Sequence, residues 1–201
     1  MKENAHSVTR TGTLLHRIDP VIAGRWSSRA IDPDREVPAE TVDRLLEAAR
    51  WAPSAFNNQP WKFLVLTSRD PESLQKGRDA LLPGNAWALN APVLIYTMAY
   101  KSYRGKDREN WRRGYETGMA AVSMAFQAVH EGLVFHQMAG FSADVLKESF
   151  GISDTYDVFT AIAAGYPGRE DLLDEKALAG ETAERIRLDP EKIICRGSWE
   201  N

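Results

Sequence analysis

The stretch Ala52–Trp61, APSAFNNQPW, is the most informative part of this sequence. It joins Pro38–Arg50, where apolar residues recur at helical spacing, to Lys62–Thr67, a short apolar run that predicts a strand. Two prolines fix its backbone, and three amide side chains can donate and accept hydrogen bonds. Such a loop matches the edge of a heterocycle with alternating C=O and N–H groups. A rigid turn with surface amides accounts for it equally well.

Further strands and helices are predicted on the C-terminal side of this stretch. Apolar runs predict strands at Pro92–Ala99, Leu133–Gln137 and Val158–Tyr166, with an edge strand at Lys192–Cys195. Capping residues, apolar spacing and polar composition predict helices at Pro71–Leu82, Glu116–His130, Ser142–Phe150 and Glu170–Ala179. The chain therefore mixes helices and strands around one core, and we expect a single α+β domain.

Two of these elements are apolar on all sides. Pro92–Ala99 is a nearly continuous apolar run, as expected for a strand covered on both faces. Apolar residues cover most of the circumference of Glu116–His130, so this helix is expected in a core or in a subunit interface. The domain spans residues 1–201, with a polar N-terminal extension at 1–18 and a C-terminal arm at 181–201.

Composition excludes several classes of protein. The 201 residues carry 25 Lys and Arg against 28 Asp and Glu, a formal net charge of −3. This balance argues against a nucleic-acid binder, whose affinity comes from neutralising many phosphates. The lone cysteine, Cys195, excludes a disulfide framework and indicates a reducing compartment. A polar N-terminus and apolar runs far below about 20 residues predict a cytoplasmic protein with no membrane partner.

Motifs for protein-borne catalysis are missing from the sequence. The patterns GxGxxG, GxxxxGK[ST], HExxH and GxSxG do not occur. The four histidines lack metal-ligand spacing, and His130 and His136 are interpreted as structural. No metal site is expected, and a bound cofactor is expected to carry the chemistry of any reaction.

Two further segments suggest ligand contacts. In Arg25–Arg29, RWSSR, alternate side chains place two guanidinium groups around a hydroxyl, which suits a phosphate; an ordinary solvated surface is the alternative. In Met138–Phe141, MAGF, the glycine permits a flat ligand to approach the backbone and leaves an N–H to donate; a plain strand-to-helix turn is the alternative.

Five segments, in this order, resemble the nitroreductase family of FMN-dependent oxidoreductases. They are RWSSRA at 25–30, EAARWAPSAFNNQPWKFLV at 47–65, GLVFHQMAGF at 132–141, AIAAGYPG at 161–168, and the pair Arg185 and Arg187. The similarity covers the chain from about Arg25 to Ile194. It implies a nitroreductase-like α+β fold, with a central, mainly antiparallel sheet flanked by helices. It also implies a homodimer with the long buried helix at its interface.

The resemblance further implies two equivalent FMN sites between the subunits. Arg29 would lie at the pyrimidine edge of the flavin, where reduction places negative charge, and the backbone near Gly140 would meet N5 and O4. These two residues would tune a reaction that FMN itself carries. The implied cofactor-binding residues are Arg25, Trp26, Ser27, Arg29, Pro53, Ser54, Ala55, Asn57, Gln59, Met138, Ala139, Gly140, Arg185 and Arg187.

The implied activity is hydride transfer from NAD(P)H through FMN to a nitro compound, quinone or similar small acceptor, with ping-pong kinetics. A flavin-binding or flavin-modifying protein of the same fold, without nitroreductase turnover, is the alternative. Lys101–Arg113, basic and aromatic, is a candidate lid over the substrate or a plain solvated loop. The chain departs from common family patterns at Trp26 and Ala139, which leaves the choice of substrate open. The sequence does not specify NADH or NADPH.

Overall fold

The computed structural model describes residues 9–199, so the predicted N-terminal extension is described from residue 9 onward. Four strands form one sheet in the order β1-β2-β4-β3, and every neighbouring pair is antiparallel. The strands are β1 (Trp61–Thr67), β2 (Val93–Tyr100), β3 (Val134–Met138) and β4 (Tyr156–Gly165). The α+β class and the antiparallel sheet predicted from the sequence are confirmed.

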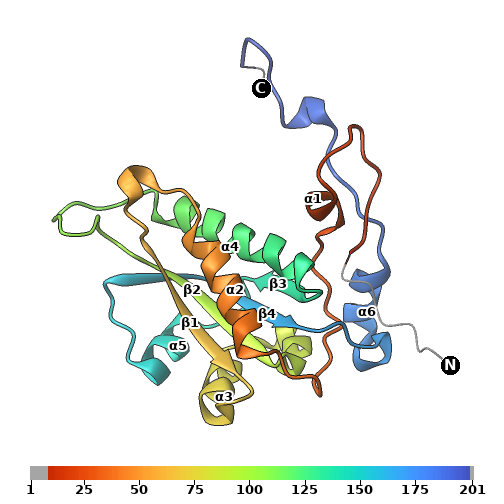
Figure 1. Ribbon diagram of the computed structural model, residues 1–201, viewed down its shortest axis with the longest axis horizontal. Coiled ribbons are helices and arrows are strands. Elements are labelled where there is room, and N and C mark those ends of the chain that lie inside the picture. Colours follow the sequence, from red (N-terminus) through yellow and green to blue (C-terminus); the bar gives the residue numbers. More distant parts are fainter. Residues whose placement is uncertain (1–8, 200–201) are drawn as a thin grey trace.

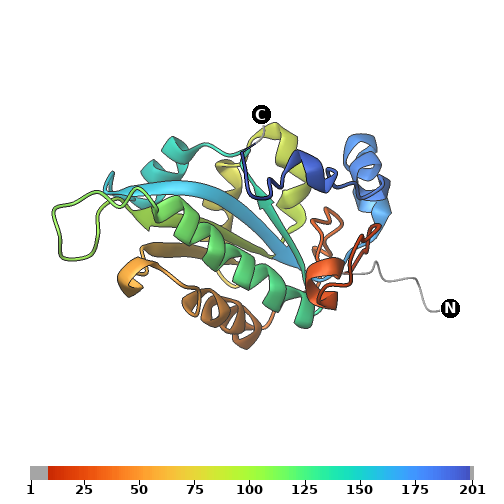
Figure 2. The ribbon, with the colours of Figure 1, turned by 90° about the horizontal axis from the view of Figure 1, so that it is seen from above.

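Helices cover both faces of this sheet (Figure 1, Figure 2). One face packs against α2 (Ala39–Arg50) and α4 (Arg113–His130). The other packs against α3 (Pro71–Asp79), α5 (Ala143–Phe150) and the 3-10 segment η2 (Pro83–Asn90). Alternate residues of β2 enter the two cores: Val93 and Ile95 the first, Leu94, Tyr96 and Met98 the second. The strand is therefore covered on both faces, as its apolar run predicts.

Four predicted elements need correction. The helix predicted over Glu170–Ala179 is a 3-10 turn, η3 (Glu170–Leu172), followed by α6 (Glu175–Thr182), because the Asp174 side chain caps a new helix by accepting the Ala177 N–H. The edge strand predicted at Lys192–Cys195 is wrong: the chain makes the single turn η4 (Pro190–Lys192) there, away from the sheet (Figure 1). The helix predicted over Pro71–Leu82 ends three residues earlier, at Asp79. The helix predicted over Glu116–His130 begins three residues earlier, at Arg113.

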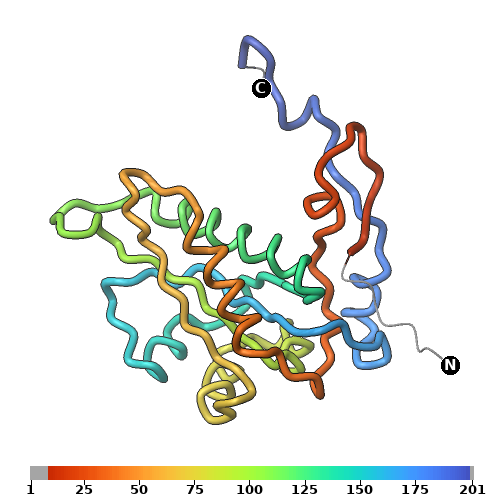
Figure 3. The backbone as a smooth tube through the Cα atoms, viewed as in Figure 1, coloured from red at the N-terminus to blue at the C-terminus, as the bar shows by residue number. Residues whose placement is uncertain are grey.

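Two chain ends run together away from the sheet as one arm. The N-terminal part contains α1 (Pro20–Gly24), a short helix whose N-terminus is capped by the Asp19 side chain. The C-terminal segment from residue 183 onward runs beside it, and its last residues continue past the tip of the N-terminal loop (Figure 3). Arg10 joins the two segments, since its side chain donates to the backbone oxygens of Thr182 and Ala183 at 2.8 and 2.6 Å. The arm brings the C-terminal arginines next to α1.

Two features of residues 9–199 bear on possible site types. No helix in that range has the length and apolar character needed to cross a membrane. The same range contains no group of His, Cys, Asp and Glu side chains that could hold a metal ion.

Candidate functional site

Residues 25–29 form a segment held between α6 and β3. The buried Ser28 hydroxyl donates to the carboxylate of Glu181 on α6, and the Arg29 N–H donates to that carboxylate at 2.8 Å. On the other side, Nδ1 of His136 on β3 lies 2.9 Å from the Ser28 carbonyl oxygen. Burial lowers the pKa of His136 to about 4, so the ring is neutral at neutral pH and donates this bond through Nδ1–H. This fits the interpretation of His136 as a structural residue.

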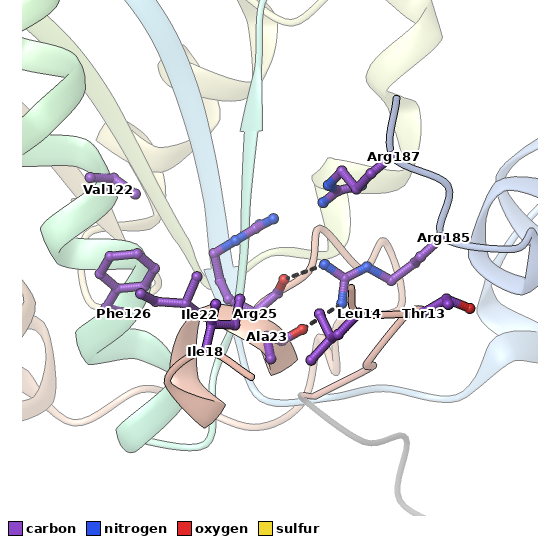
Figure 4. Close-up of a pocket in the computed structure, with 11 residues that line it drawn as sticks. Thr13, Leu14, Ile18, Ile22, Ala23, Arg25, Val122, Phe126, Arg185 and Arg187 are labelled. Atoms are coloured by element: carbon purple, nitrogen blue, oxygen red, sulfur yellow. Dashed lines mark hydrogen bonds between the residues drawn. The ribbon is translucent and has the colours of Figure 1, made fainter. Parts of the chain in front are cut away.

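Three of the predicted cofactor-binding arginines, Arg25, Arg185 and Arg187, lie together where the arm meets this segment (Figure 4). Arg185 donates to the carbonyl oxygens of Ala23 and Arg25 at 2.9 and 3.0 Å, and Arg25 donates to Ser27 Oγ at 3.3 Å. Burial lowers the pKa of Arg25 and of Arg185, and the positive charge of Arg187 lowers both further. No carboxylate of the residues from 9 to 199 forms an ion pair with any of these three arginines. The cluster is therefore a concentration of uncompensated positive charge.

A pocket of about 280 Å³ adjoins the three arginines. Its other wall is apolar and comes from the arm and from α4 (Figure 4). The apolar lining consists of Leu14, Ile18, Ile22, Val122 and Phe126. The pocket thus has a cationic side, suited to a phosphate, and an apolar side without a charged group.

Arg29 and Trp26 point to separate neighbours. The Arg29 guanidinium rests against Gly180 of α6, where an added Cβ would lie 2.4 Å from Nη1 and would push the guanidinium aside. The Arg10 guanidinium lies over the Trp26 ring, 5.2 Å from its centroid. Arg25 and Arg29, at the two ends of the predicted 25–29 segment, therefore lie in different surroundings.

The Met138–Gly140 segment follows β3 and is fixed by η2. The Met138 side chain is buried in the core, so only its backbone can reach a ligand, whereas Ala139 is exposed. The Gly140 carbonyl accepts the Leu82 N–H at 3.0 Å and Asn85 Nδ2 at 2.8 Å. The Gly140 N–H donates to no acceptor among the described residues. The backbone can thus present one unused donor beside an exposed surface, as the glycine there predicts.

The other predicted contacts lie in the loop between α2 and β1, which is strained. Phe56, Asn57 and Gln59 have φ of 54, 53 and 46°, in the left-handed region that side chains other than glycine rarely adopt. Bonds within the loop hold this shape: Gln59 N–H donates to Ser54 Oγ at 2.9 Å, and Gln59 Nε2 to Asn57 Oδ1 at 3.0 Å. The loop presents the Phe56 ring to solvent, 92% exposed.

This loop and the arginine cluster lie at opposite ends of α4 (Figure 1). The loop is tied to the first turn of the helix, where Glu116 accepts the Ala55 N–H at 2.8 Å. The pocket beside the arginines is lined by Val122 and Phe126, the latter about 15 Å of helical rise from Glu116. One chain therefore brings the predicted residues together in two groups: Arg25, Ser27, Arg185 and Arg187 at one end, and Pro53, Ser54, Ala55, Asn57 and Gln59 at the other.

Sequence reasoning misses the residues that hold these groups in place. Glu181 and Asn85 act through contacts between elements far apart in the chain, and no local pattern marks them. Glu116 is visible only as an acidic residue in the first turn of a helix, where it also favours the helix dipole. Arg104, which donates to the Asn58 and Gln59 carbonyls, carries no motif either.

Several known proteins are similar to this chain in sequence, and their names agree with one another. A protein of Archaeoglobus fulgidus, named as a candidate NADH dehydrogenase/NAD(P)H nitroreductase, is 30% identical over 68% of this chain and 78% of its own. The NADH dehydrogenase of Thermus thermophilus is 26% identical over 67% of this chain and 79% of its own.

Solved structures give the same picture. A crystal structure described as an oxidoreductase containing FMN superposes with a TM-score of 0.86 at 30% identity, over 94% of this chain and 96% of that one. A nitroreductase-type structure with FMN from Desulfovibrio desulfuricans has a TM-score of 0.71 at 24% identity, over 92% and 100%, and supports the fold alone. A model described as the nitroreductase family matches residues 22–166. The chain therefore belongs to the nitroreductase family of NAD(P)H- and flavin-dependent oxidoreductases.

Proposed function

We propose that the protein is a homodimer that holds FMN between its subunits and passes hydride from NAD(P)H to a nitro compound, a quinone or a similar small acceptor. The single observation that carries the proposal is the arginine cluster at the arm. Arg187 lies close enough to lower the pKa of both Arg25 and Arg185, and the three arginines form no ion pair among residues 9–199. A dianionic phosphate would supply the missing negative charge.

The second subunit is supported by the uncovered face of α4. Tyr115 is 72% exposed and Val122 38% exposed, and both lie on one helical stripe with the partly exposed Met119, Phe126 and Val129. An exposed apolar stripe of this kind marks an association surface. A two-fold pairing of α4 with a second α4 would bring the 53–59 loop of one chain to the arginine cluster of its partner. The site would then be complete only in the dimer.

Bound FMN supplies the capacity to accept and to donate hydride. The protein supplies position and charge: Arg25, Arg185 and Arg187 hold the phosphate, Arg29 offers a permanent cation, and the Gly140 N–H offers a donor toward the ring. The exposed Ala139 at this position has no acid to contribute, so the protein moves no proton from a side chain there. Donor and acceptor would occupy the same space in turn, which predicts ping-pong kinetics.

The loop Lys101–Arg113 is proposed as a lid over the substrate. It projects from the end of the molecule that carries the 53–59 loop (Figure 1) and is joined to it, since Arg104 N–H donates to Asn58 Oδ1 at 2.8 Å. Trp111 is 68% exposed, with the Arg112 guanidinium 4.0 Å from its ring centroid. An aromatic and cationic surface of this kind suits a planar or anionic substrate.

Anaerobic reduction of the purified protein tests the function. The protein reconstituted with FMN should be yellow, should be bleached by NADH or NADPH, and should regain its colour when a nitroaromatic compound or a quinone is added. Flavin that binds but is reduced by neither nicotinamide would instead support a flavin-binding or flavin-modifying role. A colourless protein that binds no added FMN would contradict both.

A further inference from the structure

Glu116 is a buried carboxylate with an unusual set of partners. Its side chain is in the first turn of α4, and the residue is only 2% exposed. Oε1 accepts the Ala55 N–H at 2.8 Å, and Oε2 accepts Asn110 Nδ2 at 2.9 Å. No Lys, Arg or His of the described chain pairs with it. Burying a carboxylate away from water is costly, so its two hydrogen bonds, rather than an ion pair, are what keep it in place.

The two bonds lead to two different loops. Ala55 belongs to the strained 53–59 loop, which carries five of the proposed cofactor contacts. Asn110, which is fully buried, closes the 101–113 loop: its N–H donates to the Lys101 carbonyl at 2.8 Å, and its Oδ1 accepts the Arg112 N–H at 3.1 Å. Each oxygen of one carboxylate therefore holds one loop.

A second link joins the same loops farther from the helix. Arg104 Nε donates to the Asn58 carbonyl at 2.9 Å, and Nη2 donates to the Gln59 carbonyl at 2.8 Å. The 53–59 and 101–113 loops are therefore joined at two separate places and form one unit. The helix N-terminus is the fixed end of that unit, because the buried face of α4 is part of the core.

We infer that Glu116 is a positioning residue that couples the cofactor-side loop to the substrate-side loop. The inference rests on the proposed function for what the two loops contact, but the coupling itself belongs to this chain alone. Loosening of either loop, 53–59 or 101–113, should then be accompanied by loosening of the other. Ligand contacts at 53–59 and the closure of 101–113 would be linked through this one side chain.

Reversing donor and acceptor in the hydrogen bond between Glu116 and Asn110 tests the inference. In Glu116→Gln, the amide can accept from Ala55, but its NH₂ then faces the NH₂ of Asn110. In Glu116→Gln/Asn110→Asp, the new amide donates to the new carboxylate, and one buried negative charge remains. We expect the single variant to speed amide hydrogen exchange in 53–59 and 101–113 together and to weaken FMN binding about tenfold, the effect of losing one charge-assisted bond. The double variant should restore both.

A matched control is available at the other end of the same helix. Glu131 pairs with Arg44 at 2.6 Å, and Glu131→Gln makes the same chemical change there. It should leave exchange in both loops and the FMN affinity unchanged. If Glu116→Gln does not fold, Asn110→Ala poses the same question, because release of the lid-side bond should speed exchange at the Ala55 amide.

The outcomes separate the coupling from the proposed function. Faster exchange in only one loop, faster exchange throughout β2 and β4, or no rescue by the double variant would each overturn the coupling. Wild-type protein that binds no FMN would contradict the proposed function and leave the exchange result to decide the coupling. Rescue of both exchange and FMN affinity is the result expected if Glu116 positions the loops.

Discussion

The Nδ1 atom of His136 lies 2.9 Å from the carbonyl oxygen of Ser28, so a neutral imidazole on β3 holds the segment that carries Arg25 and Arg29. Burial keeps the pKa of this ring at about 4 in the folded protein, against 6.5 for the ordinary value. The unfolded chain therefore binds a proton between pH 6.5 and 4 that the folded chain does not.

This difference predicts a loss of stability as the pH falls. The free energy of unfolding should be highest above pH 6.5, decrease through the interval down to about 4, and lose at most about 3 kcal/mol to this group. The carboxyl groups of Glu47 and Glu131, whose pKa values are lowered to about 2 by their arginine partners, add their own losses only below about pH 4.5. Urea unfolding of the wild type and of His136→Gln at pH 7.0 and 5.0 checks this. The difference between the two pH values should shrink in the variant, and an equal difference in both proteins would refute the assignment.

Arg187 is predicted to contribute to ligand binding and not to the stability of the fold. It is exposed, and the hydrogen bond recorded for its side chain is to the neighbouring Ile186 carbonyl at 2.9 Å. Arg187→Gln should leave the melting temperature of the apoprotein unchanged or slightly raised, because the charge repulsion on Arg25 and Arg185 falls. The rise in melting temperature on adding FMN should shrink, since mass action converts weaker binding into less stabilisation. Arg50→Gln, which removes an exposed arginine on α2, is the control and should keep the full FMN effect.

Gly140 is predicted to be required for packing as well as for ligand approach. A Cβ there would lie 2.6 Å from Asn85 Nδ2, so Asn85 would have to leave the Gly140 carbonyl. Gly140→Ala should therefore lower the free energy of unfolding by about 1 kcal/mol, the net value of one hydrogen bond, and should weaken FMN binding as the N–H moves. Gly84→Ala has open space around its Cβ and should be neutral in both assays. Unchanged FMN binding in Gly140→Ala would remove this backbone from the proposed site.

The sequence predicts the layers of this fold better than it predicts the site. Apolar spacing is enough to find β2 and most of α4, since each presents core residues at a regular period. The arm is not predicted by such spacing: α1 has only five residues, and the turn near Lys192 is a single 3-10 turn closed by local backbone bonds to the Asp189 and Pro190 carbonyls. Within the proposed site, RWSSR and APSAFNNQPW stand out because guanidinium, hydroxyl and amide groups that suit a ligand occur within one short stretch. Glu181, Glu116 and Asn85 are not, because each acts on a backbone group distant in the chain.

The 101–113 loop yields a prediction about substrate rather than cofactor. Trp111 projects to solvent, and its side chain supports no core contact. Trp111→Ala should therefore leave FMN affinity and the melting temperature unchanged and raise KM for the nicotinamide or the acceptor several-fold. Steady-state kinetics with both substrates varied checks this. Trp51→Ala is the comparison, because Trp51 at the end of α2 is also largely exposed (76%). The same KM values in both variants would show that 101–113 is a solvated loop rather than a lid.

The uncovered face of α4 makes the proposed dimer testable by one matched pair of substitutions. Val122 on α4 and Val145 on α5 have nearly the same exposure, 38% and 39%, but only Val122 lies in the apolar stripe beside the arginine pocket. Val122→Glu places a charge in the proposed interface, where it would be buried without a partner. Light scattering should find it monomeric, and FMN binding should be lost with the dimer because the 53–59 loop of the second chain is then missing. Val145→Glu adds the same charge to a surface outside the stripe and should remain a dimer with bound FMN. A folded Val122→Glu monomer that still binds FMN tightly would show that one chain suffices for the site, and a dimer of undiminished stability would place the interface on another surface.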